Sequence, residues 1–332
     1  MKAIHFTGWG VAGLADLREP ELEPGHALVR VMASGLCHTD IDVLYGRYGN
    51  GAFPLVPGHE YAGIVEAVAE DVTDWRPGDR VAIDPNIPCG KCRSCRKGLT
   101  NLCETLEAYG VSRNGGFAEY STVKTGHLHA TGNLPFHMAA LAEPLACVLN
   151  GLGNARASSA ENALVFGAGP IGLLMALSLK AQGVEDVSVA DINESRLTFA
   201  QSLGLTPLRS GSSDLAHLKK SFDFVADATG IAQVVEDMIA YTADGGTALV
   251  FGVSAPDARI QIAPFEIFRR QISLVGSHSL NRNIPEALAI LQRDNGMMAR
   301  LVSHRLPLAD VLPYLSKGTA TPQTMKVQFS TE

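Results

Sequence analysis

Residues 163–172 read ALVFGAGPIG, an apolar run that passes directly into three closely spaced glycines. The apolar residues Ala163–Phe166 predict a buried strand, and the leucine-rich stretch from Pro170 to Gln182 predicts a helix. A strand, a glycine turn and a helix in this order are typical of the first unit of a parallel α/β sheet. This stretch therefore decides the fold class of the part of the chain that follows it.

The glycine turn predicts a binding site for a dinucleotide. Its first glycine permits a tight turn, its second lets the backbone approach a pyrophosphate, and its third lets the helix pack closely on the strand. The helix N-terminus also directs partial positive charge at the phosphates. A glycine turn without a dinucleotide is the alternative interpretation. The predicted cofactor-binding residues of the turn are Gly167, Gly169, Pro170, Ile171 and Gly172.

An acidic residue follows the turn at the spacing that a dinucleotide site requires. Asp191 lies nineteen residues beyond Gly172, at the end of a second predicted strand over Val187–Ala190. A carboxylate at this place can accept hydrogen bonds from both ribose hydroxyls of an adenosine, and it repels a 2′-phosphate. We therefore expect NAD rather than NADP. Arg196 can stack on the adenine or, alternatively, contact a phosphate.

The strand and helix pattern continues beyond Asp191 and then stops. A helix over Glu194–Leu203 and strands over Phe224–Ala228 and Ala248–Phe251 follow in alternation, which requires crossover connections and hence a parallel sheet. Residues 1–145 instead read as many short strands divided by turn residues. The sequence thus predicts a β-rich domain followed by a doubly wound parallel sheet.

Composition limits the class of protein and its partners. The chain has 332 residues, 46% hydrophobic and 18% charged, with a formal net charge of −7. These values describe a globular protein of about two domains, and they argue against nucleic acid or an anionic membrane as a partner. The start of the chain lacks the apolar segment of a signal peptide, so we expect a cytoplasmic protein acting on a small molecule.

Four cysteines in one short loop predict a metal site. They follow a C-x-x-C-x-x-C pattern, and seven residues separate the third cysteine from the fourth. Four thiolates suit tetrahedral Zn²⁺. A pair of disulfides is the alternative, although nothing else in the chain indicates a secreted protein. A closed four-thiolate site has no open position, so we expect a structural zinc. Its ligands are Cys89, Cys92, Cys95 and Cys103.

A second group of residues could hold a catalytic metal. Cys37 follows a predicted strand, with Thr39 two residues later, and a glycine-containing turn supplies His59 and Glu60. Taken singly, such a cysteine or histidine is more often a core residue. Taken together, cysteine, histidine and an acid can supply the three protein ligands that a catalytic zinc requires beside one open position.

Several stretches, taken in order along the chain, resemble the zinc-dependent medium-chain dehydrogenases. This resemblance implies a GroES-like catalytic domain over residues 1–145, completed by a return segment over 277–332, and a Rossmann domain over 146–276. The stretches that carry it are the C-x-T-D motif at Cys37, Gly58–Gly63, the four-cysteine loop, Gly115–Tyr120, Ala142–Leu145 and the glycine-rich turn.

The resemblance also implies the roles of individual residues. Cys37 and His59 would be ligands of the catalytic zinc, Glu60 and Glu143 exchangeable or outer carboxylates, and Thr39 the proton relay. With the four-cysteine site, two zinc ions per chain are expected. Cys147, four residues after Glu143, is an alternative ligand.

The residues Glu143-Pro144 resemble the branch of polyol and threonine dehydrogenases, because simple alcohol dehydrogenases carry a cysteine in this region. The threonine enzymes often have a histidine before the first loop cysteine, where this chain has Asp84–Pro88. We therefore expect reversible, NAD-linked oxidation of a secondary hydroxyl of a polyol to a ketose, by a homodimer or homotetramer. L-Threonine or a vicinal diol is the alternative substrate, and a non-catalytic zinc- and nucleotide-binding protein is the alternative class.

Overall fold

The computed structural model describes residues 1–49, 51–316 and 319–331, and it divides the chain into two compact units. The second unit is one continuous segment, whereas the first combines the beginning of the chain with its last part. Their bounds are Met1–Ala146 with Leu280–Glu332 for the first unit and Cys147–Ser279 for the second. Both divisions fall within three residues of the positions predicted from the sequence.

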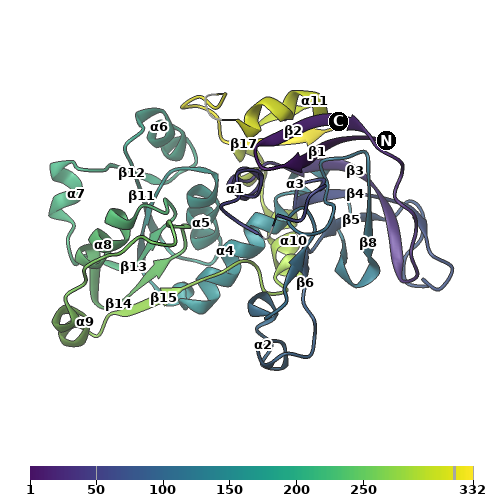
Figure 1. Cartoon of the computed structure of the whole chain (residues 1–332). Helices are drawn as coiled ribbons and strands as arrows, with labels where there is room; N and C mark the ends of the chain where they lie inside the picture. Colours follow the sequence, from purple (N-terminus) through teal and green to yellow (C-terminus); the bar gives the residue numbers. More distant parts are fainter. Residues whose placement is uncertain (50, 317–318, 332) are drawn as a thin grey trace. The chain divides into compact units, whose positions relative to one another are not determined.

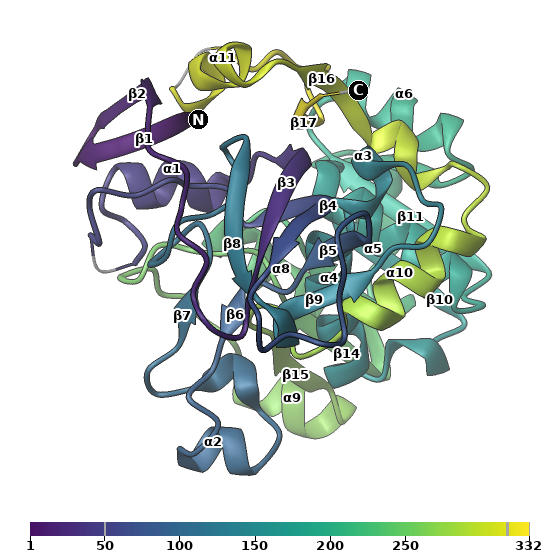
Figure 2. The same ribbon diagram turned by 90° about the vertical axis from the view of Figure 1, so that its right-hand side faces the viewer.

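The first unit is built on a sheet with the strand order β16-β17-β3-β4-β5-β9, in which β8 also pairs with β3 (Figures 1 and 2). Among its described strands β16 and β17 pair in parallel and the other pairs are antiparallel. Two small two-stranded sheets, β1 with β2 and β6 with β7, lie outside it. The strands are β1 Lys2–Gly8, β2 Val11–Asp16, β3 His26–Gly35, β4 Glu60–Val68, β5 Arg80–Ile83, β6 Asn86–Ile87, β7 Glu107–Ala108, β8 Tyr120–Lys124, β9 Leu128–Ala130, β16 Val302–Leu306 and β17 Lys326–Ser330.

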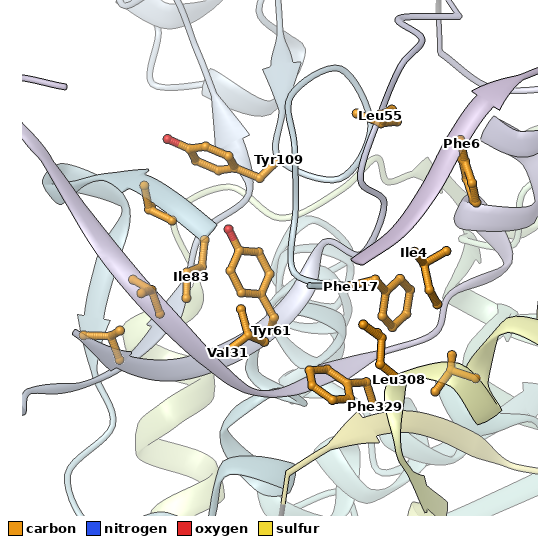
Figure 3. Close-up of a cluster of buried hydrophobic side chains, with 14 of the residues drawn as sticks. Ile4, Phe6, Val31, Leu55, Tyr61, Ile83, Tyr109, Phe117, Leu308 and Phe329 are labelled. Atoms are coloured by element: carbon orange, nitrogen blue, oxygen red, sulfur yellow. The ribbon is translucent and has the colours of Figure 1, made fainter. Parts of the chain in front are cut away.

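The core of the first unit comes from alternate residues of its strands. In β3, Ala27, Val29 and Val31 are fully buried, because residues two apart in a strand point to the same side of the sheet. Figure 3 shows the aromatic rings of Tyr61 and Phe117 among the aliphatic side chains of this core. This dry cluster holds rigidly the strands whose ends carry the site residues.

The helices of the first unit are short, and one helix crosses into the second unit. In both views the loop that carries α2 stands apart from the large sheet of its unit (Figures 1 and 2). The helices are α1 His38–Leu44, α2 Arg93–Arg96, α3 Phe136–Ala139, α4 Ala142–Asn154, α10 Ile284–Arg293 and α11 Leu308–Val311, with single 3₁₀ turns at Thr100–Leu102, Thr125–His127, Met298–Leu301 and Leu312–Leu315.

The second unit is a parallel sheet with the strand order β12-β11-β10-β13-β14-β15. In order of appearance along the chain this is 3-2-1-4-5-6, the strand order of a Rossmann domain, so the predicted fold class is confirmed. Helix α5 packs on β10 and β11, and α8 packs on β13 and β14. The elements are β10 Asn162–Phe166, α5 Pro170–Ala181, β11 Asp186–Asp191, α6 Glu194–Ser202, β12 Thr206–Arg209, α7 Ser213–His217, β13 Phe222–Asp227, α8 Ala232–Tyr241, β14 Thr242–Val250, α9 Pro264–Arg270 and β15 Ser273–Gly276, with a 3₁₀ turn at Ala157–Ser159.

A search of the described part of the chain for membrane spans finds no helix with the length and apolar character that crossing a bilayer requires.

Candidate functional site

The four loop cysteines converge on one point. Their four sulfur atoms all lie within 4.8 Å of one another, as the spacing of the cysteines in the sequence predicted. Backbone N–H groups of the loop donate to these sulfurs: Cys92 N to Cys89 Sγ at 3.3 Å and Cys95 N to Cys92 Sγ at 3.4 Å. Such donors stabilise thiolates, which are the form that binds a metal. None of these four cysteines forms a disulfide, so the alternative pairing is not present.

The thiols of this loop differ in acidity. Hydrogen bonds from the backbone N–H groups of Lys91 and then Cys92 lower the pKa of the Cys89 thiol to about 6. Burial, and then contact with neighbouring thiols, raises the pKa of Cys95 to about 12. Four thiolates at this separation repel one another, and a bound dication removes that repulsion. The donor set therefore fits Zn²⁺, with Cys89, Cys92, Cys95 and Cys103 as its ligands.

A single asparagine ties the cysteine loop to the return segment of the first unit. The Asn281 side chain accepts hydrogen bonds from Thr100 N at 3.1 Å and from Thr100 Oγ1 at 2.8 Å, and it donates to Gly98 O at 3.0 Å. These bonds replace the water that the loop backbone would otherwise need. The loop is thus anchored by a residue that the sequence analysis did not select.

The second metal site is assembled where β3 and β4 pair. In this antiparallel pair Gly35 faces Glu60, so Cys37, two residues after Gly35, comes close to His59, one residue before Glu60. Ligand atoms of Cys37, His59 and Glu60 all lie within 4.8 Å of one another. A thiolate, an imidazole and a carboxylate at this spacing can ligate one zinc ion and leave a position open.

Asp40 holds the two ligand-bearing loops together. Its carboxylate is buried and accepts hydrogen bonds from Cys37 N at 2.9 Å and from Gly58 N at 3.1 Å. The same carboxylate lies 3.3 Å from His59 Nδ1, which leaves Nε2 of the imidazole for a metal. Burial alone would lower the pKa of His59, but Asp40 and then Cys37 raise it well above 6.5. A more basic imidazole is a stronger metal ligand.

The other residues predicted for this site lie outside the close group of ligand atoms formed by Cys37, His59 and Glu60. Thr39 is half-buried, with its Oγ1 3.6 Å from Cys37 Sγ. Glu143 is buried in the first turn of α4, but it does not belong to the described group of close ligand atoms. Cys147 lies one turn further along α4, where the second unit begins, and also stands outside that group.

Lys326 is the second residue that sequence reasoning missed. Its Nζ lies 2.7 Å and 2.6 Å from the two carboxylate oxygens of Glu60, and both side chains are buried. In the sequence analysis this residue belongs only to the return segment predicted over 277–332. A lysine in a strand gives no sequence signal of its partner, because that partner lies 266 residues away.

The glycine turn of the second unit has the geometry that was predicted. Gly167 follows β10 with a φ of +104°, a conformation that favours glycine. A Cβ on Gly172 would lie 1.8 Å from the Gly167 carbonyl oxygen, so only glycine permits this contact between helix and turn. Gly169 is the N-cap residue of α5 and Pro170 its first residue. The backbone N–H groups at this helix N-terminus are available to a phosphate.

Asp191 and Arg196 both lie next to this turn. Asp191 Oδ2 accepts a hydrogen bond from Ala168 N at 2.7 Å, and Oδ1 accepts one from Asn193 N at 2.8 Å. A carboxylate offers about four acceptor sites, so Asp191 can brace the turn and still accept ribose hydroxyls. An Nη1 atom of Arg196 lies 3.9 Å from the point where a Cβ of Gly169 would be. The guanidinium therefore lies over the turn.

Comparison with known proteins is consistent with both units. Residues 23–133 match the model of the alcohol dehydrogenase GroES-like domain, and residues 170–293 match that of the zinc-binding dehydrogenases. The chain is 67% identical to a D-altritol 5-dehydrogenase of Agrobacterium fabrum, over 100% of both chains. It is 33% identical to D-arabinitol dehydrogenase 1 of Uromyces fabae, over 98% of this chain and 96% of that one.

A solved structure has nearly the same backbone. It is a putative zinc-binding dehydrogenase from Sinorhizobium meliloti bound to NADP, with a TM-score of 0.93, 29% identity and coverage of 98% of each chain. The chain belongs to the zinc-binding, medium-chain dehydrogenases, as its sequence predicted. Within that family it falls in the branch of the polyol dehydrogenases, and the predicted branch is confirmed as well.

The two metal sites can be separated by mutation. We expect elemental analysis to find two zinc ions per wild-type chain and one in Cys95→Ser, because a tetrahedral four-thiolate site tolerates loss of a ligand poorly. The variant should lose thermal stability, since zinc binding at such a site contributes to folding. Ser94→Ala, in the same short helix, is the control and should retain both ions. Two zinc ions in Cys95→Ser would refute the assignment.

Proposed function

We propose that this chain is a zinc-dependent, NAD-linked dehydrogenase that oxidises the C5 hydroxyl of D-altritol to a ketone. The observation that carries the proposal is 67% identity to a D-altritol 5-dehydrogenase over the full length of both chains. Oxidation at C5 of a hexitol gives a 2-ketohexose when the product is numbered from its other end. The polyol substrate and the ketose product expected from the sequence are therefore those of this reaction.

The residues around Cys37 can carry out the first half of this chemistry. Zinc held by Cys37 and His59, with Glu60 or Glu143, would supply the Lewis acidity that lowers the pKa of a substrate hydroxyl. The Thr39 hydroxyl lies 3.6 Å from Cys37 Sγ, and this distance supports a role in which it would accept the released proton and pass it toward solvent. A bound nicotinamide coenzyme would supply the acceptor for the hydrogen of the carbinol carbon, which would leave with its electron pair.

The role of Thr39 can be tested by removing only its hydroxyl. Thr39→Val has nearly the same shape but cannot carry a proton, so we expect kcat for D-altritol to fall about 100-fold or more. Thr39→Ser keeps the hydroxyl and should retain most of the activity. Zinc content should be unchanged in both variants. Equal activity of Thr39→Val and Thr39→Ser would show that another group moves the proton.

The substrate can be tested by initial rates with a panel of alcohols. We expect kcat/KM for D-altritol to exceed that for galactitol, D-mannitol and D-glucitol by about tenfold or more, because a site that hydrogen-bonds each hydroxyl rejects epimers. L-Threonine and 2,3-butanediol represent the alternative substrates of the same fold. A higher kcat/KM for either of these, or for another hexitol, would contradict the proposed specificity.

The preference for NAD rests on Asp191, although the solved relative from Sinorhizobium meliloti is bound to NADP. Asp191 ends β11 and is buried beside the turn that would hold the pyrophosphate. A 2′-phosphate placed against this carboxylate would be repelled, whereas ribose hydroxyls would be bound. Arg196, close to the same turn, would neutralise phosphate charge without favouring either coenzyme.

Substitution of Asp191 should change the selectivity between the coenzymes. Asp191→Asn removes the charge and Asp191→Ala also removes the acceptors, so we expect KM for NAD to rise about tenfold or more in both. KM for NADP should rise much less in Asp191→Ala and should fall in Asp191→Asn. Rates with each coenzyme give the comparison. An equal loss for NAD and NADP would show that Asp191 only braces the turn.

We further propose that the chain works in the cytoplasm as a homodimer or homotetramer. The loop cysteines are thiols, which suits a reducing compartment. Strand β15 is an edge of the parallel sheet in the second unit, and Leu274 on it is 44% exposed. Phe265 and Phe268 on α9 are also exposed. An unpaired edge beside apolar side chains favours pairing with a second copy.

A further inference from the structure

The ion pair between Lys326 and Glu60 is unusual because both partners are almost completely withdrawn from water. The side chain of Lys326 is 5% exposed and that of Glu60 is 1% exposed. Charged side chains at such depth are rare, because each loses its hydration and must be compensated by a partner. A buried ion pair of this kind contributes little net stability compared with apolar residues in the same place. Its presence is therefore better explained by a role in function than by a role in stability.

The Lys326 ammonium group donates two hydrogen bonds, to Glu60 Oε1 and Leu36 O, and makes an ion-pair contact with Glu60 Oε2. Its Nζ lies 2.7 Å from Glu60 Oε1, 2.6 Å from Glu60 Oε2 and 3.2 Å from the carbonyl oxygen of Leu36. The ammonium group is therefore charged and held in one orientation.

The Glu60 carboxylate is confined on its other side as well. A Cβ on Gly35 would lie 2.2 Å from Glu60 Oε2, so the carboxylate occupies the space that any side chain at residue 35 would need. From this slot a carboxylate oxygen of Glu60 still lies within 4.8 Å of the ligand atoms of Cys37 and His59. The carboxylate thus faces a lysine and a candidate metal position at the same time.

Lys326 brings a positive charge to a cluster of acidic groups. Cys37, Glu60 and Glu143 are groups whose negative charge acts on Lys326. A zinc ion among these three would leave one negative charge, which the ammonium group compensates. Asp40 is already engaged by His59 and by two backbone N–H groups. A buried anion with a partner of opposite charge avoids the cost of an uncompensated ion.

We propose that Lys326 is a positioning residue that shares the Glu60 carboxylate with the catalytic metal. By contacting both oxygens of Glu60, it keeps this carboxylate a weak, exchangeable ligand and so preserves an open position for the substrate hydroxyl. The inference rests on the zinc assignment in the proposed function, but not on the identity of the alcohol. It gives a role in the reaction to a residue that touches neither substrate nor coenzyme.

Removal of the ammonium group should increase the affinity of the Cys37 site for zinc. Without Lys326 the buried Glu60 has lost its cation, and zinc becomes its only strong partner. The positive charge that repels the metal is lost at the same time. Both effects act in the same direction. In Lys326→Met we therefore expect zinc to be bound more strongly and the open position to be occupied more of the time.

The first measurement of the test is the rate of zinc release, and activity is measured afterwards. Zinc-loaded wild type and Lys326→Met are mixed with excess chelator, and release from the Cys37 site is followed separately from release by the cysteine loop. We expect release from the Cys37 site to be at least about tenfold slower in Lys326→Met. In the Co²⁺-substituted variant, visible absorption should weaken as the coordination number rises. For D-altritol, kcat should fall with little change in KM.

Two controls separate positioning from general destabilisation. Lys326→Arg keeps a cation beside Glu60 and should restore the wild-type rate of zinc release. Arg270→Met removes another buried cation, which pairs with Asp244 and Glu266 in the second unit. It should lower stability and leave zinc release unchanged. Release from Lys326→Met that is as fast as, or faster than, that from wild type would overturn the proposal.

Variants of Glu60 show whether Lys326 acts through this carboxylate. Glu60→Gln alone is nearly isosteric and should release zinc about tenfold faster, and unchanged release would overturn the proposal even if Lys326→Met does not fold. In the double variant of Lys326→Met and Glu60→Gln, the slower release should disappear, and slower release that persists would also overturn it. No alcohol is present in these measurements, so an incorrect substrate assignment would not affect them.

Discussion

The antiparallel pairing of β3 with β4 is the constraint on which the proposed metal site depends. In this register Gly35 faces Glu60, and the two strands end beside each other with Cys37 and His59 just beyond their ends. A shift of one residue would turn every side chain of a strand to the opposite face. The buried core around Tyr61 and Phe117 makes such a shift costly, and thereby fixes the distance between the sulfur and the imidazole (Figure 3).

The parts of the molecule that could be predicted from the sequence are those in which a local geometry demands particular residues. The turn after β10 requires glycine at residue 172, because any side chain there would meet the backbone. The four loop thiols lie within fourteen residues of one another and have few ways to converge other than around a metal. Cys37 and His59 are further apart, so their residue types suggested a metal site, and the resemblance to a known family assigned them as its ligands.

The residues that escaped prediction act through partners far away in the sequence. Asp40 was read only as part of the motif after Cys37, although it binds the loop before β4. Asn281 and Thr100 are 181 residues apart, and no pattern in either segment announces their hydrogen bonds. Strand β12 was also missed, because Pro207 argues against a strand. The structure places β12 at an edge of the sheet, where a proline is tolerated.

The position of β17 within its sheet has a consequence for the order of folding. This strand lies between β16 and β3, although its residues come almost 300 positions after those of β3. During synthesis the second unit is complete before β17 emerges from the ribosome. The second unit can therefore fold while the sheet of the first unit still lacks an interior strand. Until then the end of β3, at Ala33, Ser34 and Gly35, lacks its partner β17 and is exposed to pairing with other chains. The unit that begins the chain is therefore the last to mature and the more dependent on protection from aggregation.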